Sequence, residues 1–510
     1  MTIQIDFNEF SLTHFIGKLK NDELSIVNEK QNLSGVASVL ENNTKAVIFN
    51  HINGSDFKLC GNVAGSRERI ARAFNTTKEN LLFEVTKRLN KPGELVKVSS
   101  QDAPVHEVIL KGNECDLTSL PIHLQHGLDG APYISSGIDV VSDPNSGWTN
   151  VGIRRLMVTG RKKAGIDLVA PSDLRAIYIE ESKKGKRVPV SFIIGTNPID
   201  HVAATMRIPS DELTLISALR GKPVGIVKCI TNDIWVPADA QMILEGYLDE
   251  NGHSTEEGPY GEFLGYYGGV KKNPVFHLTG ITHRRDCLFQ TSTISGSEMA
   301  KTDTAQLSAL RTEVTVWRAL EVAVREIKGV FADPASGGTF NVRVALNQRV
   351  PGEAKSAIAA VFACMANVKH VYIVDPDIDI FSSEQMEWAM ATRFQADRDM
   401  IYATGFRAMP LDPSLQEGKT TAKLGFDLTL PFQFAEKERS MIYRIPKPPS
   451  FLGEKFKSLE DALIDGPKFF QDLMASISST DGREIICWLE DNTLTRNIQR
   501  DAQGRYYIPQ

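Results

Sequence analysis

Alternating apolar and polar positions divide the first half of the chain into two regions. In the first 110 residues, short apolar runs alternate with helical patterns, and residues 47–50 predict a strand while residues 71–74 predict a helix. From residue 111 to about residue 302, β-type runs punctuated by glycine predominate, among them residues 133–141 and 188–195. Such runs predict an antiparallel sheet or a barrel.

A long helical pattern follows this β-rich region. Apolar side chains recur at helical spacing at Leu307, Leu310, Val314, Trp317, Val324 and Ile327. Asp303 and Gln306 have the spacing of a capping box, and Lys328 and Gly329 are typical of a helix end. We therefore predict a linker helix over residues 303–329.

Strand and helix patterns alternate again after the helix, as at residues 371–374 and 384–393. The tail opens on a proline-rich stretch at residues 446–449 and then offers helical pieces such as residues 459–464. It either docks on a partner subunit or stays loose. The pattern as a whole predicts an α/β (α+β) chain with the boundaries 1–110, 111–302, 303–329, 330–445 and 446–510.

Composition excludes several classes of protein. The 510 residues carry a net charge of −6 and no basic run interleaved with aromatic residues, so we expect no nucleic-acid partner. The six cysteines are scattered singly, which predicts neither a zinc site nor a disulfide framework and fits a reducing cytosol. We find neither a signal-peptide pattern nor a long uncharged apolar run, so the interpretation is a cytoplasmic protein without a membrane partner.

The most informative motif is Glu257-Gly258-Pro259-Tyr260-Gly261-Glu262. Two glycines and a proline favour a tight, irregular backbone that can turn both acids into one cavity. Two neighbouring carboxyls push their pKa values apart, so that one can hold a proton while the other is ionised. On spacing alone, the motif also fits a solvated loop with two surface acids.

Several strings resemble one family in order and spacing. They are residues 148–155 (WTNVGIRR), 203–209 (AATMRIP) with Glu212, 227–233 (VKCITND), 236–238 (VPA), 243–246 (ILEG), 257–262 (EGPYGE) and 265–267 (GYY). Together they resemble the UbiD family of decarboxylases over residues 6–435, approximately.

The resemblance implies a fold, cofactors and partners. It implies an α/β amino-terminal region, a split-barrel-like flavin-binding domain, a linker helix and a carboxy-terminal α/β oligomerisation domain. It also implies prenylated FMN supplied by a flavin prenyltransferase, a divalent metal, usually Mn²⁺, and K⁺ at the cofactor phosphate. A homo-oligomer is expected, and the sequence leaves open whether it is a dimer or a hexamer.

The resemblance also assigns catalytic roles. Arg155 matches the arginine that grips the substrate carboxylate, which suits the planar fork of a guanidinium. Its alternative is an ordinary surface ion pair. Glu257 matches the glutamate that pairs with this arginine, and Glu262 matches the proton donor to the carbon left by carbon dioxide. A raised pKa on Glu262 would keep that proton available at neutral pH.

Further residues match cofactor, metal and substrate positions. Asn150 and Glu212 match Mn²⁺ ligands, and Asp173 stands where the family commonly has histidine. Either the metal persists with an aspartate ligand, or it binds differently, or the match is locally out of register. K⁺ positions are matched by Val151, Ala203, Met206, Glu212 and Arg393. Other cofactor positions are matched by Gly152, Ile153, Arg154, Ser172, Ala204 and Thr205, in addition to Asn150, Arg155, Asp173, Met206 and Glu212. The substrate pocket is matched by Arg407, Met409 and Leu411, for which ordinary core packing is the alternative.

These matches predict a carboxy-lyase. The expected reaction is reversible, nonoxidative decarboxylation of an aromatic, heteroaromatic or α,β-unsaturated acid through a covalent adduct between substrate and prenylated FMN. The alternative is a subunit of a carboxylating complex, or a flavin carrier with little activity alone. The sequence does not distinguish among the possible acids or indicate the preferred direction.

Overall fold

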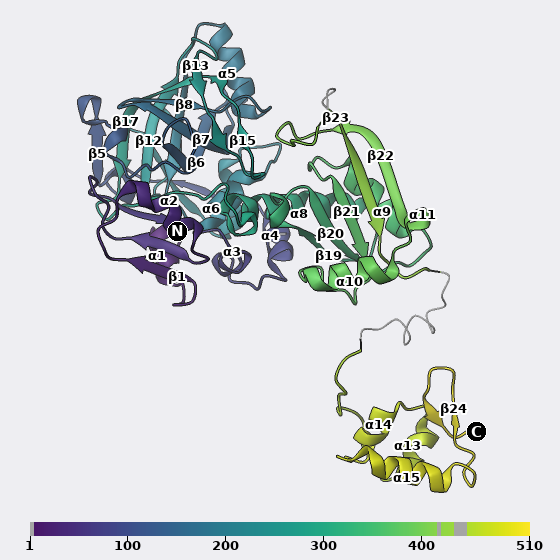
Figure 1. The fold of residues 1–510 in the computed structure, drawn as a ribbon. Helices are drawn as coiled ribbons and strands as arrows, with labels where there is room; N and C mark the ends of the chain where they lie inside the picture. The colour runs from purple at the N-terminus through teal and green to yellow at the C-terminus, as the bar shows by residue number, and fades with distance from the viewer. Residues whose placement is uncertain (1–4, 416–419, 433–445, 510) are drawn as a thin grey trace.

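A computed structural model describes residues 5–415, 420–432 and 446–509 (Figure 1). The barrel-like sheet and the amino-terminal elements lie on one side, the carboxy-terminal sheet lies beside them, and helix α8 lies between (Figure 1). The arrangement confirms the predicted mixed α/β fold with a barrel at its centre.

The central region is a closed antiparallel barrel. Its strands follow the order β12-β9-β6-β7-β8-β17, and pairing of β12 with β17 closes the ring, as the glycine-punctuated runs predict. The strands are β6 (Tyr133–Ser142), β7 (Thr149–Gly160), β8 (Lys163–Ile166), β9 (Val188–Ile194), β12 (Met242–Leu248) and β17 (Val275–His283).

Short elements inserted between the barrel strands carry much of the site. The helices are α5 (Asp173–Lys183), α6 (Pro198–Thr205) and α7 (Leu213–Arg220). The short strands are β10 (Val224–Lys228), β11 (Trp235–Pro237), β13 (Thr255–Glu257), β14 (Tyr260–Gly261), β15 (Tyr267–Gly268) and β16 (Lys271–Asn273). A further short strand, β18 (Leu288–Gln290), follows the last barrel strand.

The amino-terminal region is joined to the barrel by strand pairing. Its strands are β1 (Leu24–Val27), β2 (Ala46–Phe49), β3 (Lys58–Gly61), β4 (Leu95–Lys97) and β5 (Val108–Lys111), and its helices are α1 (Leu12–Gly17), α2 (Leu33–Glu41), α3 (Arg67–Ala73) and α4 (Leu81–Leu89). The β18 strand pairs with β3, β4 pairs with β10, and β5 pairs with β17. The region predicted as residues 1–110 therefore shares its sheets with the residues that follow.

Helix α8 (Asp303–Ala323) begins where the sequence predicts but ends six residues early. Thr302 is its N-cap, and its hydroxyl accepts a hydrogen bond from the Ala305 N–H. Predicting a helix end at Lys328 and Gly329 was wrong, because both lie in β19 (Ile327–Ala332), where pairing with β20 replaces helical bonds. Gly329 follows an irregularity in that pairing, a typical position for a strand glycine.

Two buried carboxylates attach α8 to the amino-terminal region. Asp303 accepts a hydrogen bond from the Ala64 N–H, and Glu313 forms a 2.8 Å ion pair with Arg67. Both acids are almost wholly buried, so each contact is shielded from water.

The carboxy-terminal region is a mixed five-stranded sheet in the order β19-β20-β21-β23-β22. Its remaining elements are β20 (Asn341–Leu346), β21 (His370–Val374), β22 (Met400–Arg407), β23 (Thr420–Asp427), α9 (Glu353–Ala363), α10 (Ser383–Arg393) and α11 (Ala396–Asp399). The strand and helix predicted at residues 371–374 and 384–393 are β21 and α10.

The tail forms a small folded unit. It contains α13 (Leu459–Asp465), α14 (Phe470–Ser476), α15 (Gly482–Asn492) and the pair β24 (Gln499–Arg500) and β25 (Tyr506–Tyr507). Leu463, Leu473 and Ile485 form its core. Within the described ranges, every helix is too short or too polar to cross a membrane.

Candidate active site

Arg155 lies at the centre of an acidic cluster. Its guanidinium contacts Glu257 through two nitrogens, at 2.8 and 3.3 Å, and Glu262 through a third, at 3.0 Å. Asp167 approaches the same guanidinium at 3.0 Å. The Arg155 side chain is only 12% exposed, so these are strong, weakly screened contacts. The structure thus brings together the three side chains to which the resemblance assigns catalytic roles.

A bent backbone places Glu257 and Glu262 on the same guanidinium, as the motif predicts. Gly258 has a φ of +99°, in the region that favours glycine. A Cβ on Gly261 would lie 2.4 Å from the Nδ1 of His126, so no larger residue fits there without a shift. Glu257 ends β13, and Glu262 follows β14.

Asp167 and Lys271 complete the cluster, and the sequence interpretation missed both. In the β7–β8 hairpin, Leu156 pairs with Ile166, which places Asp167 beside Arg155. Lys271 pairs directly with Glu257 between β16 and β13, and its Nζ lies 3.7 Å from Glu262. Cross-strand register was the feature that could have identified them, because directly opposed side chains interact.

Burial and neighbouring charges shift the pKa values of Glu262 and Asp167 in opposite directions. Burial raises the pKa of Glu262, although the charges of Arg155 and Lys271 oppose the shift. Burial also acts to raise the pKa of Asp167, but Arg155 and Lys271 outweigh it and lower that pKa overall. Glu262 is therefore the carboxyl that holds a proton most readily, in the direction the sequence predicts.

One oxygen of Glu262 is buried without a hydrogen-bond partner in the described part of the chain. A Cβ on Gly268 would lie 2.6 Å from this Oε1 atom, so a glycine at that position makes room for it. An unpaired carboxylate oxygen is costly when ionised, and protonation relieves that cost. Lys271 Nζ approaches this oxygen only to 3.7 Å, beyond hydrogen-bond distance, so Glu262 can hold its proton there.

Two tyrosine rings pack beside the Arg155 guanidinium, one directly and one through the other. The Tyr260 ring centre lies 4.5 Å from the Arg155 guanidinium carbon, and its hydroxyl donates a 2.6 Å hydrogen bond to Gln125. Tyr133 packs against Tyr260 with ring centres 4.2 Å apart. The contact is a cation–π interaction that fixes Arg155 in a desolvated setting.

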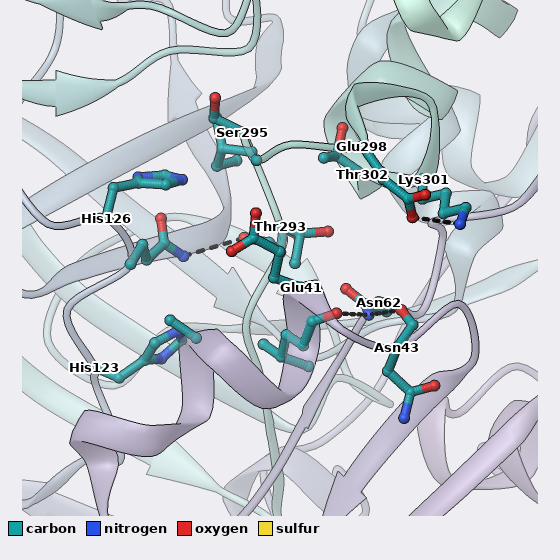
Figure 2. A pocket seen from close by; sticks show the side chains of 16 residues that line it. Glu41, Asn43, Asn62, His123, His126, Thr293, Ser295, Glu298, Lys301 and Thr302 are labelled. Carbon is teal, nitrogen blue, oxygen red and sulfur yellow. Dashed lines mark hydrogen bonds and ion pairs between the residues drawn. The ribbon is translucent and has the colours of Figure 1, made fainter.

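A small cavity of about 50 Å³ lies next to Gln125, the partner of Tyr260. Figure 2 shows His123 and His126 on one side of it and Glu298 and Lys301 on the other. Burial lowers the pKa of His123 to about 4, so its imidazole is neutral at pH 7. Gln125 lines the cavity and also holds Tyr260, whereas none of the three predicted catalytic residues lines it.

The predicted Mn²⁺ ligands also come together. Asn150 donates hydrogen bonds to Glu212 at 2.6 Å and to Asp173 at 3.3 Å. In the described residues, no group of three or more His, Cys, Asp or Glu side chains is arranged to hold a metal. Asp173 and Glu212 supply two carboxylates. A half-turn of the Asn150 amide would add its oxygen, and all three are hard ligands. Burial raises the pKa of Glu212, and a cation bound there would reverse that effect.

The predicted K⁺ ligands are only partly assembled. Carbonyls of Val151 and Met206 accept hydrogen bonds from one Arg207 nitrogen, at 3.2 and 2.7 Å, and Glu212 lies 3.9 Å from the same nitrogen. Arg393 instead forms ion pairs with Asp377 and Asp375, and α10 lies well away from β7 (Figure 1). The Ala203 carbonyl accepts a hydrogen bond from the Met206 N–H. The Arg207 guanidinium therefore lies at the position that the resemblance assigns to K⁺.

The other predicted cofactor residues border the same place. Gly152, Ile153 and Arg154 follow Asn150 on β7, and Ala204 and Thr205 end α6. Ser172 is the N-cap of α5, immediately before Asp173. The predicted pocket residues lie at the end of β22: Arg407 is its last residue and is exposed, and Met409 and Leu411 follow in the loop.

Three family models match this chain. They describe the Rift-related domain, the amino-terminal domain and the carboxy-terminal domain of 3-octaprenyl-4-hydroxybenzoate carboxy-lyase (UbiD), and match residues 96–298, 25–89 and 305–428. The folded tail lies beyond all three.

Curated relatives and solved structures match most of the chain. Anhydromevalonate phosphate decarboxylase of Methanosarcina mazei is 35% identical over 419 residues, covering 81% of this chain and 95% of that one. Gallate decarboxylase of Lactiplantibacillus plantarum is 28% identical, covering 83% and 92%. The UbiD-class enzyme HmfF from Pelotomaculum thermopropionicum, in complex with FMN, has a TM-score of 0.80 at 32% identity, covering 86% and 97%. An evolved dimeric form of HmfF was solved with prFMN.

Proposed function

The chain belongs to the UbiD family and is a carboxy-lyase, and on that premise we propose that it decarboxylates an aromatic, heteroaromatic or α,β-unsaturated acid with prenylated FMN. The observation that supports this most is the proton-holding Glu262 on the same guanidinium as Glu257. The proposal includes cofactor supply by a flavin prenyltransferase, assembly as a homo-oligomer in the cytoplasm, and reversibility.

The relatives define the range of substrates. One acts on anhydromevalonate phosphate and another on gallate, so their names span a phosphorylated acid and an aromatic one. We keep both classes in the proposal, because the residues around Arg155 recognise a carboxylate in either.

Charge balance explains how Arg155 can receive a substrate. Asp167, Glu257 and Glu262 supply three negative charges against the two positive charges of Arg155 and Lys271. Protonation of Glu262, whose pKa is raised, makes the negative and positive charges of the cluster equal. It also weakens the contact of Glu262 with one Arg155 nitrogen. The substrate carboxylate takes that nitrogen, while Glu257 keeps the guanidinium oriented through its two contacts.

The same proton completes the reaction. When bound, prenylated FMN would supply a covalent electron sink for the charge left as carbon dioxide departs. Glu262 then donates its proton to the substrate carbon, becomes ionised and pairs again with Arg155. A proton from solvent restores Glu262 for the next turnover, so one proton is consumed for each carbon dioxide released.

Asn150, Asp173 and Glu212 would hold the divalent metal, since they supply three hard oxygen ligands in one place. The K⁺ positions fit less well, because Arg207 already donates to the Val151 and Met206 carbonyls. The proposal therefore assigns no step to K⁺.

The test is release of carbon dioxide from a panel of acids by protein co-produced with a flavin prenyltransferase. Arg155→Gln should lower the rate on the best acid at least about 100-fold, because both orientation and charge stabilisation are lost. The matched control is Arg161→Gln, a 76% exposed arginine that also pairs with a carboxylate, Asp116. It should retain the full rate.

A rate in Arg155→Gln equal to that of Arg161→Gln would refute the carboxylate-binding role. Failure of the flavin-loaded protein to release carbon dioxide from any acid tested would instead favour the carrier or complex-subunit alternative. Circular dichroism of both variants must match the parent chain for either conclusion.

A further inference from the structure

Lys271 faces the free oxygen of Glu262 across a short gap. Its Nζ lies 3.7 Å from Glu262 Oε1, which is buried and accepts no hydrogen bond within the described part of the chain. The Lys271 ammonium likewise donates no hydrogen bond to the described residues. A donor and an acceptor that both lack a partner thus lie within about 1 Å of bonding distance, which a small side-chain rotation closes.

Strand pairing holds Lys271 at this place, and its side chain reaches water. Lys271 on β16 lies directly opposite Glu257 on β13, so the register fixes its backbone beside the acidic cluster. The Lys271 side chain is 26% exposed, whereas that of Glu262 is only 6% exposed. Lys271 therefore connects the buried carboxyl with solvent.

The charged neighbours of Glu262 are unsuited to bring it a proton. Arg155 holds Glu262 Oε2 at 3.0 Å, and a guanidinium keeps its protons in proteins. Although burial opposes the shift, Arg155 and Lys271 lower the pKa of Asp167, which is therefore ionised at neutral pH. Both oxygens of Glu257 accept hydrogen bonds from Arg155, and its side chain is out of contact with water.

The other titratable side chains near Glu262 are engaged elsewhere. The Tyr260 hydroxyl donates its hydrogen bond to Gln125. The His126 imidazole, beside Gly261, contacts Asp129. Among the described residues around Glu262, Lys271 therefore remains as the proton carrier.

We propose that Lys271 returns a proton to Glu262 after each turnover. An Nζ–H bond breaks, an O–H bond forms on Glu262 Oε1, and the amine keeps the electron pair. The neutral amine then takes a proton from solvent, so each cycle consumes one solvent proton. Use of the proton at the substrate carbon rests on the proposed function, whereas its delivery to Glu262 does not.

Three variants of the full chain separate proton delivery from charge. Lys271→Ala removes both, and Lys271→Arg keeps the charge on a group that does not release its protons. Lys272→Ala is the matched control, because Lys272 is the next residue of β16, is exposed and lies opposite Glu256.

The first measurement needs no substrate. Starting above the pKa of Glu262, a light pulse releases protons from a caged acid, and time-resolved infrared absorption follows the protonated carboxyl band that Glu262→Gln lacks. The band should rise at least about tenfold more slowly in Lys271→Ala and in Lys271→Arg, and at the parent rate in Lys272→Ala.

The second measurement is carbon dioxide release by the flavin-loaded protein. Lys271→Ala should lower kcat at least about tenfold with little change in KM, because the loss lies after substrate binding. Methylammonium should restore the rate of Lys271→Ala in proportion to its concentration, since it can occupy the vacated space and supply the proton.

Parent kinetics of the infrared band in Lys271→Ala would overturn the proposal. Parent kinetics in Lys271→Arg would overturn it as well, because the positive charge alone would then suffice, and this variant keeps the test decisive if Lys271→Ala does not fold. A band rise that depends on Lys271 in protein that releases no carbon dioxide would support the proton delivery while refuting the proposed function.

Discussion

Arg155 is largely buried and Arg311 is half-buried, and their surroundings are opposite. Arg155 is surrounded by Glu257, Glu262 and Asp167, whereas the charged groups that influence Arg311 are the guanidiniums of Arg207 and Arg407. The first arginine is held in place before any ligand arrives. The second has no ion-pair partner among the described residues.

The difference shows how one residue type serves two purposes. An excess of acid fixes the Arg155 guanidinium and keeps a proton on Glu262, which a reacting carboxylate requires. An excess of base gives little orientation but a strong field for a multiply charged group. Variants that change the local charge excess test this contrast directly.

Glu262→Gln should have the largest effect on the acidic side of the comparison. The amide keeps the shape but cannot donate a proton to carbon, so the rate should fall about 100- to 10,000-fold. Stopped or steady-state assays of carbon dioxide release measure the change. Glu256→Gln, on the exposed neighbour of Glu257, should retain the rate, and a similar loss there would contradict the specific role of Glu262.

Asp173→Ala should weaken metal retention by at least about tenfold, because it removes one of three hard ligands. Elemental determination of manganese and absorbance of bound flavin after gel filtration measure the result. Asp233→Ala removes a 93% exposed aspartate and serves as the control. Unchanged manganese and flavin in Asp173→Ala would show that this aspartate is not a ligand.

Asp167→Asn should shift the pH dependence of the rate. Glu262 acts in its protonated form, so activity falls as pH rises through its pKa in the folded protein. The negative charge of Asp167 helps to raise that pKa, and its removal should move the alkaline limb to lower pH by less than about one unit. A limb that stays in place or moves to higher pH would contradict this coupling.

Tyr260→Phe should have the smallest effect. The ring remains against Arg155, but Gln125 loses a buried 2.6 Å hydrogen bond, which should lower the free energy of unfolding by about 1 kcal/mol. Urea denaturation measures the change. Tyr260→Leu removes the ring as well and should also lower the rate, and equal rates in both variants would show that the cation–π contact has no positioning role.

The acidic site was largely predictable from sequence because its members lie in local motifs. Glu257 and Glu262 share one bent segment, and Arg155 lies in a distinctive run on β7. Asp167 and Lys271 were missed because their positions depend on strand register, which the hydrophobic pattern does not specify.

The charges that act on Arg311 could not be predicted in this way. Arg207 follows α6 and Arg407 ends β22, and their positive charges act on Arg311 in α8. The end of α8 was misplaced for a related reason, since pairing of β19 with β20 outweighs the local helical pattern. Arg393, matched to a K⁺ position, has a side-chain ion pair with nearby Asp377, and its K⁺ role stays a prediction.

The buried attachments of α8 limit how this helix can move. Asp303 and Glu313 anchor the helix to the amino-terminal region at two points, one on each side of Arg311 along the helix. Sliding of the helix would break both anchors at once, so α8 and the amino-terminal region are expected to move as one unit.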